Sequence, residues 1–149
     1  MSINYTVQID TTLEIEEFVK RFSMASELDL SEGGVLYNNG VIVRCYAPGE
    51  LQASVILEAF SFKPKITISF LFDKASEFTS NTSTMFGMLN ALRYMVVDHY
   101  VLLANDEKIV LEYRDNTLFL NAQWDDWNKD QYSVITHPYS IETINSPLL

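Results

Sequence analysis

The segment INYTVQIDTTLEIEEFVKRFSMAS, residues 3–26, decides the fold, because its hydrophobic period changes part-way along. From Ile3 to Ile9, apolar and polar side chains alternate, which predicts a β-strand with one face towards solvent. From residue 12 to residue 26 the apolar residues recur at helical spacing, and charged residues occupy the other faces. Thr11 and Glu14 have the spacing of a capping box, so the helix is expected to begin beside them.

Short strands account for most of the remaining pattern. Asn38-Asn39-Gly40 lies between two apolar runs and predicts a hairpin, because Asn and Gly tolerate positive φ. The segment from Leu51 to Ala59 also fits a short helix, but the longer run 53–62 is interpreted as a strand. Strands are expected at 35–37, 41–46, 53–62, 66–72, 100–104, 108–113 and 117–121.

A second helix is expected over residues 84–99, after a polar, Ser/Thr-rich loop at 73–84. The resulting order favours an α+β fold: a mostly antiparallel sheet of about six to eight strands, with two helices packed on one face. The chain has 149 residues, which is the size of one domain. Residues 1–149 are therefore taken as a single domain, on which the irregular C-terminal tail 124–149 packs.

Charge and composition exclude several classes of partner. The net charge is −10 and the pI about 4.5, which disfavours nucleic acid and anionic membranes and favours a basic protein partner. No apolar run is long enough to span a bilayer. The N-terminal residues lack the pattern of a secretory signal, and Cys45 is the only cysteine. A cytoplasmic protein is expected.

The residues that usually carry catalysis form no recognisable motif. Cys45 shares strand parity with Val41 and Val43, which predicts a buried, inert thiol. His99 and His137 are too far apart in sequence to form a metal signature, and the glycines do not form a phosphate-binding loop. We therefore expect no enzyme activity, no cofactor and no metal.

The segment Trp124-Asp125-Asp126-Trp127 is the most concentrated feature of the chain. Trp124 continues the preceding strand and is expected to cap the core. An anchoring aromatic residue surrounded by carboxylates is typical of a surface that binds a basic partner. The predicted partner-binding residues are Asp125, Asp126, Trp127 and Asp130.

Five stretches of the chain together form a recognisable pattern: the opening strand, the segment from Phe60 to Phe70 with Asp73-Lys74 after it, the strand pair around 105–120, the Trp-Asp-Asp-Trp segment, and Tyr139 after Pro138. In these stretches the chain resembles the immunity proteins of bacterial polymorphic-toxin systems, in particular the swarming-inhibition (Sit-type) immunity family. Before Phe62-Lys63-Pro64 the family pattern has a glycine, whereas this chain has Ser61.

The resemblance implies a non-enzymatic protein that neutralises a cognate toxin, with one molecule covering one toxin. The acidity of the chain fits a basic toxin. The alternative is a structural or adaptor domain that acts through homodimerisation and has no toxin partner.

Overall fold

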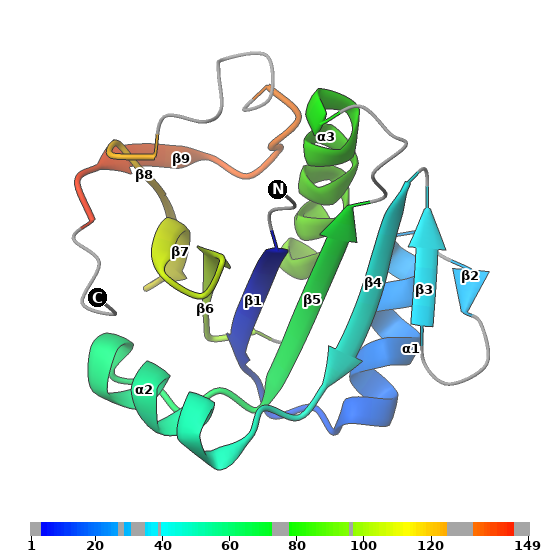
Figure 1. Cartoon of the computed structure of the whole chain (residues 1–149), viewed down its shortest axis with the longest axis horizontal. Helices are drawn as coiled ribbons and strands as arrows, with labels where there is room; N and C mark the ends of the chain where they lie inside the picture. Colours follow the sequence, from blue (N-terminus) through cyan, green and yellow to red (C-terminus); the bar gives the residue numbers. More distant parts are fainter. Residues whose placement is uncertain are drawn as a thin grey trace.

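The computed structural model describes residues 4–26, 29–30, 35–38, 40–72, 78–95, 97–124 and 133–144. Its strands form one sheet in the order β2-β3-β4-β5-β1-β6-β7-β8-β9 (Figure 1). Every described pair is antiparallel except β8 with β9. The strands are β1 (Asn4–Asp10), β2 (Asp29–Leu30), β3 (Val35–Asn38), β4 (Val41–Tyr46), β5 (Ile66–Phe72), β6 (His99–Ala104), β7 (Lys108–Arg114), β8 (Thr117–Asn121) and β9 (Tyr139–Glu142).

The predicted α+β class and the mostly antiparallel sheet are confirmed. Within the described residues the sheet has nine strands, more than expected. The two strands that were not predicted are short and lie at its edges: β2 has two residues and β9 has four. Short strands of this kind have too few residues to show a period of two in the sequence. The β3–β4 hairpin is found as predicted, and Gly40 has a φ of 86° in its turn.

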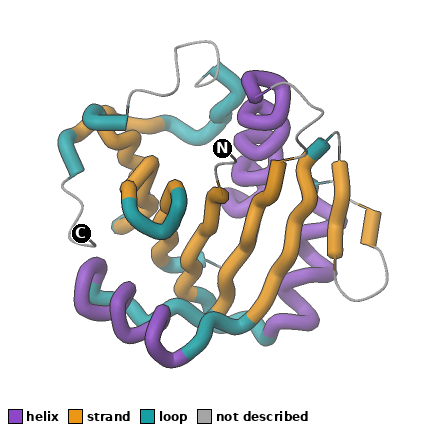
Figure 2. The backbone as a smooth tube through the Cα atoms, in the orientation of Figure 1, coloured by secondary structure: helices purple, strands orange, loops and turns teal. Residues whose placement is uncertain are grey.

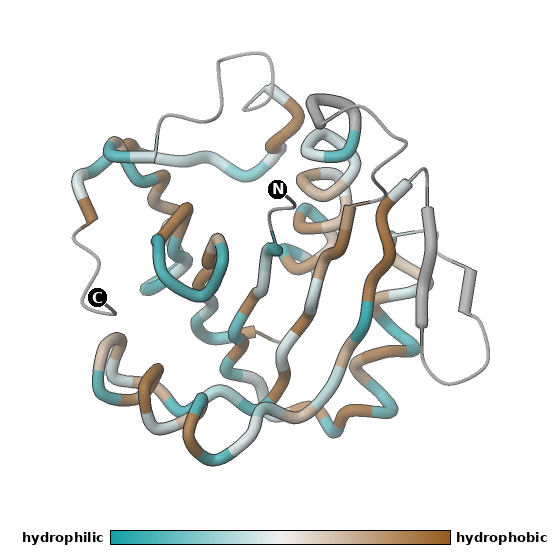
Figure 3. Tube along the Cα trace, in the orientation of Figure 1, coloured by the Kyte–Doolittle hydropathy of each residue, from teal (hydrophilic) through white to brown (hydrophobic). Residues whose placement is uncertain are grey.

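The core of the molecule lies on one face of the sheet, with β1 at its centre. Tyr5, Val7 and Ile9 are fully buried there, and the alternate residues of β1 face the opposite way. Thr6 and Gln8 on that opposite face are buried as well, so the predicted solvent-facing side of this strand is wrong, because β1 lies at the centre of the sheet. Helix α1 (Ile15–Ala25) adds Phe18 and Phe22 to this core. Figure 3 shows the hydrophobic stretches that run along the central strands.

The second predicted helix covers the same face, as expected. It consists of α3 (Phe78–Leu89) and a 3₁₀ turn, η2 (Asn90–Tyr94), and lies behind the sheet with α1 (Figures 1 and 2). The prediction of a loop over 73–84 is wrong from residue 78 onward, where the helix has already begun. Ser, Thr and Asn have low helix propensity, so burial of Thr82 and its neighbours outweighs local preference here. The predicted helix end at His99 is wrong as well, because η2 ends at Tyr94 and His99 begins β6.

The predicted capping box of α1 is not formed. Glu14 is the N-cap residue and makes no side-chain capping bond, so the helix begins three residues later than expected, at Ile15. The Thr11 hydroxyl accepts a hydrogen bond from the Leu13 N–H at 3.2 Å. Thr11 therefore stabilises the turn before the helix, and not the helix itself.

The strand predicted at 53–62 is wrong, because residues Glu50–Phe60 form a third helix, α2. This helix packs on the opposite face of the sheet from α1 and α3. There Ala53, Ile56 and Phe60 are buried, and Ile56 and Phe60 form a second hydrophobic cluster with Val101, Leu103 and Ile109 of the sheet. The two predicted helices do share one face, but the fold has a helix on the other face as well.

Candidate functional site

The α2 face of the sheet is covered only in part, and its centre is polar. Gln8 of β1 and Thr67 of β5 are both fully buried there, and the Thr67 hydroxyl donates to Gln8 Oε1 at 2.8 Å. Beside them, apolar side chains remain exposed: Leu51 and Val55 on α2, Leu71 on β5 and Tyr46 on β4. An exposed apolar area next to buried polar groups is a common property of binding surfaces.

A cavity of about 310 Å³ opens between α2 and the sheet on this face. Its walls are mostly apolar side chains of α2, and its one charged lining residue is Asp106. Leu51, at the rim, is 80 % exposed. The lining residues are Leu51, Gln52, Val55, Ile56, Leu103 and Asp106.

The Asp106 carboxylate is held in position by the β6–β7 turn. Asn105 and Asp106 both have positive φ, and the Glu107 N–H donates to the Ala104 carbonyl at 3.1 Å, which is the geometry of a type I′ turn. Asp106 Oδ1 accepts a hydrogen bond from the Thr6 hydroxyl at 2.9 Å. Asn105 also bonds to Asn4, through its own N–H and through its side-chain oxygen.

The Asp106 carboxylate also affects the ionisation of Tyr46, on strand β4. Burial, and secondarily the charge of Asp106, raise the pKa of the Tyr46 phenol. Tyr46 is therefore a neutral hydrogen-bonding group at physiological pH, within electrostatic reach of the cavity.

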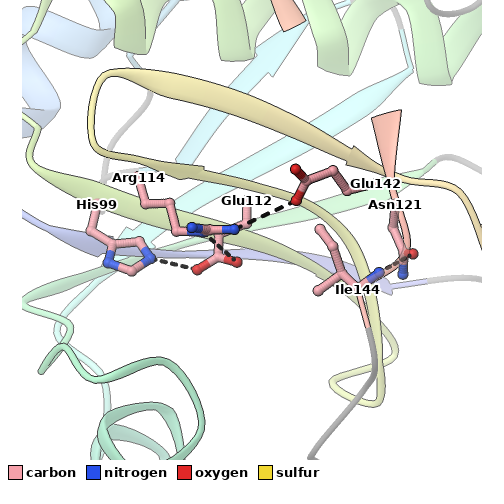
Figure 4. A network of polar contacts seen from close by, with 6 residues as sticks. All are labelled: His99, Glu112, Arg114, Asn121, Glu142 and Ile144. Carbon is pink, nitrogen blue, oxygen red and sulfur yellow. Dashed lines mark hydrogen bonds and ion pairs between the residues drawn. The ribbon is translucent and has the colours of Figure 1, made fainter. Parts of the chain in front are cut away.

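A chain of polar contacts crosses the sheet on the same face, further along β7 (Figure 4). His99 Nε2 lies 2.7 Å from Glu112 Oε2, and the other oxygen of Glu112 lies 3.5 Å from Arg114 Nε. Arg114 Nη2 lies 3.7 Å from Glu142 Oε2, on β9. The Arg114 guanidinium also stacks over the ring of Phe119, at 4.3 Å from its centre.

A histidine beside a carboxylate is a component of many general-base sites. Here the His99 ring packs on Phe62, with ring centres 4.1 Å apart, and Arg114 shares the carboxylate. Among the residues that the structure describes, no hydroxyl or thiol is hydrogen-bonded to His99. The geometry therefore favours a structural role, in which the network joins β6, β7 and β9.

Asn121 completes the attachment of β9. Its amide donates to the Ile109 carbonyl at 2.6 Å, and its side-chain oxygen accepts from the N–H groups of Gln123 and Ile144 (Figure 4). The Ala122 N–H donates to the Glu142 carbonyl. The C-terminal segment, expected to be irregular, thus contains a strand that pairs with β8 and is further held by the buried side chain of Asn121.

Cys45 has the predicted strand parity. It packs against the core on the α1 face but is only partly buried, so the prediction of a buried thiol holds in part; desolvation raises the pKa of the thiol to about 12. His99 lies on the opposite face of the sheet, and three strands separate Cys45 from Tyr113, the ring that His137 contacts. Neither histidine is placed to activate the thiol, which agrees with the prediction of an inert cysteine.

The predicted partner-binding residues Asp125, Asp126, Trp127 and Asp130 lie outside the described residues. The residues that flank them are well anchored. Trp124 is buried in the core, as predicted, with its ring edge-on to Tyr5 at 6.5 Å. On the far side, the side chain of Asn90 bonds to the Val134 carbonyl and to the Thr136 N–H.

The described ranges contain no cluster of three or more His, Cys, Asp or Glu residues arranged to hold a metal ion. None of the helices within those ranges has the length and hydrophobicity needed to cross a membrane.

Comparison with known families identifies the family of this chain. The sequence model of the SitI3-like family matches residues 3–131. The chain belongs to the SitI3-like family. This confirms the resemblance to Sit-type immunity proteins, and the matched range includes all four predicted partner-binding residues. Neither the curated proteins nor the solved structures include a significant match.

The cavity was missed by the sequence analysis because α2 was interpreted as a strand. The signal was present: Ala53, Ile56 and Phe60 have the spacing of one helical face, and Gly49 follows Pro48 at the start. The exposed Leu51, Val55 and Leu57 obscured it, because they make the helix apolar on several sides.

Proposed function

We propose that this SitI3-like protein is an immunity protein that neutralises a cognate bacterial toxin by binding it, one molecule to one. Membership of the family over residues 3–131 is the observation that carries the proposal. The net charge of −10 supports a basic toxin, because opposite charge accelerates encounter between proteins. The protein acts by covering the toxin and catalyses nothing.

Features of the described residues agree with a binding role. The α2 face carries exposed apolar side chains around a cavity, and the His99–Glu112 pair is engaged in holding strands together. The segment with Asp125, Asp126, Trp127 and Asp130 follows the buried Trp124 and precedes residues tied to Asn90. It remains our proposal for part of the toxin-binding surface.

Co-expression tests the function. The product of the gene adjacent to that of this chain is expressed in a bacterial host, alone and together with the chain. We expect growth arrest in the first case, full growth in the second, and co-purification of the two proteins. Continued arrest in the presence of folded, soluble chain would reject the proposal. A chain that associates only with itself would favour the adaptor alternative.

A further inference from the structure

The cavity beneath α2 combines three properties that select a particular ligand chemistry. Its volume of about 310 Å³ is at the lower end of the range of ~300–1,000 Å³ for ligand sites, and suits one long side chain. Its walls are apolar, from Leu51, Val55, Ile56 and Leu103. Its single charged lining group is the carboxylate of Asp106, and none of its described lining residues is basic.

An arginine or lysine side chain matches all three properties. Its aliphatic stem packs on apolar walls while its charged end reaches a carboxylate. The Asp106 carboxylate is already oriented by the Thr6 hydroxyl and by a turn that Asn105 ties to β1. An oriented acceptor loses little further conformational entropy when a ligand binds.

The surroundings of the cavity favour a protein partner as the source of that side chain. Leu51 is 80 % exposed at the rim, and Val55, Tyr46 and Leu71 are exposed on the same face. A small cation filling the cavity would leave these apolar groups in water, whereas a protein surface would cover them. The net charge of −10 also steers basic proteins towards the chain.

We infer that the α2 cavity receives an arginine or lysine side chain of the toxin, with Asp106 as its ionic partner and Leu51 and Val55 packed around its stem. The inference rests on the proposed function, and adds a second contact surface, on α2 and the β6–β7 turn, to the one proposed at 125–130. Its partner is identified by chemistry: a basic side chain flanked by apolar residues.

Matched substitutions test the cavity in the full-length chain. Asp106→Asn removes the charge but keeps a residue that tolerates positive φ, so the turn is retained. Asp115→Asn makes the same change in the β7–β8 turn, where φ is also positive and which lies outside the cavity. Loss of a charge-assisted hydrogen bond should weaken toxin binding by roughly tenfold or more for Asp106→Asn. We expect less than about a twofold change for Asp115→Asn.

The apolar rim is tested in the same way. Leu51→Ser and Leu57→Ser both replace an exposed leucine of α2, but only Leu51 lines the cavity. We expect faster dissociation of the toxin only for Leu51→Ser. Equal effects of Asp106→Asn and Asp115→Asn, or of the two leucine substitutions, would overturn the inference. So would sedimentation data showing that the wild type dimerises and that Leu51→Ser makes it monomeric.

Small-molecule probes test the cavity in the absence of the toxin, and therefore independently of the proposed function. The chain alone is titrated with butylguanidinium, and with the neutral butylurea, while amide NMR signals are recorded. We expect the signals of Val55, Leu103 and Asp106 to shift with the cation only, and the shifts to disappear in Asp106→Asn. If the wild type does not bind the toxin, the proposed function fails, and these shifts still decide the chemistry of the cavity. Equal shifts with both probes would reject the acidic site.

Discussion

Ser61 has a backbone conformation that its side chain disfavours. It ends α2 with a φ of 63°, in the left-handed region where glycine carries no steric penalty. The resemblance to Sit-type immunity proteins implies a glycine at this position, and a glycine would adopt this φ without strain. The chain retains the helix C-cap but bears the strain of a Cβ atom.

Replacement of Ser61 by glycine should therefore stabilise the protein. We expect Ser61→Gly to raise the free energy of unfolding by about 0.5–1 kcal/mol, after allowance for the greater entropy of the unfolded chain. Ser54→Gly, at an exposed interior position of the same helix, should lower it by about 0.5 kcal/mol. Urea unfolding measures both, and a loss of stability in Ser61→Gly would contradict the left-handed cap.

Cys45 should react slowly with thiol reagents in the folded protein. Burial raises the pKa of its thiol to about 12, so the reactive thiolate is scarcer at every pH below that value than for an ordinary cysteine. We expect labelling at pH 8 to be at least about a hundredfold slower in the native protein than in urea. Equal rates in the two states would show that the strand does not direct this side chain into the core.

The elements that the sequence predicted are those whose patterns are local. Strand β1 alternates strictly, helix α1 has one apolar face, and turns with Asn and Asp separate β6, β7 and β8. Helix α2 was misassigned because exposed leucines hide its buried face. The start of α3 and the strand β9 depend on contacts between residues distant in sequence, such as that of Asn121 with Ile144. Local sequence patterns cannot predict such contacts.

The side chain of Asn121 reinforces the attachment of β9 to β8. We expect Asn121→Ala to lower the free energy of unfolding by about 2–3 kcal/mol, because it leaves the Ile109 carbonyl and two N–H groups without their partner. Hydrogen exchange of β9 should accelerate as well. Ser140→Ala, on the exposed strand β9 itself, is the control and should change neither quantity. Unchanged exchange in Asn121→Ala would show that the pairing with β8 and the Arg114–Glu142 ion pair hold β9 without this side chain.

The segment that follows Trp124 has its own test. Reversal of charge in Asp125→Lys with Asp126→Lys should slow association with the toxin, most strongly at low salt, because these carboxylates steer a basic partner. Trp127→Ala should chiefly accelerate dissociation. Thermal unfolding of each variant is the control for folding. Association that is unchanged by the double reversal at low ionic strength would remove this segment from the binding surface.

At the level of the whole molecule, the two faces of the sheet differ in what covers them. One face, with α1 and α3, holds the main core, and the other, with α2, presents a partly apolar surface with a cavity whose one charged lining residue is Asp106. The sequence predicted the fold class from its repeated local patterns, and the resemblance of several stretches to Sit-type immunity proteins indicated the family. The α2 surface was not predicted, because its residues come from 51–56, 103 and 106 and meet only in the folded chain.

The central claim is that the protein neutralises its toxin by stoichiometric binding. The direct measurement is a titration of purified toxin, at a concentration well above the dissociation constant, with increasing amounts of this chain, while toxin activity is followed. The account predicts a linear fall in activity that ends at one equivalent and is restored when the complex is dissociated. Complete loss of activity at a small fraction of one equivalent, or no loss at several equivalents, would contradict it.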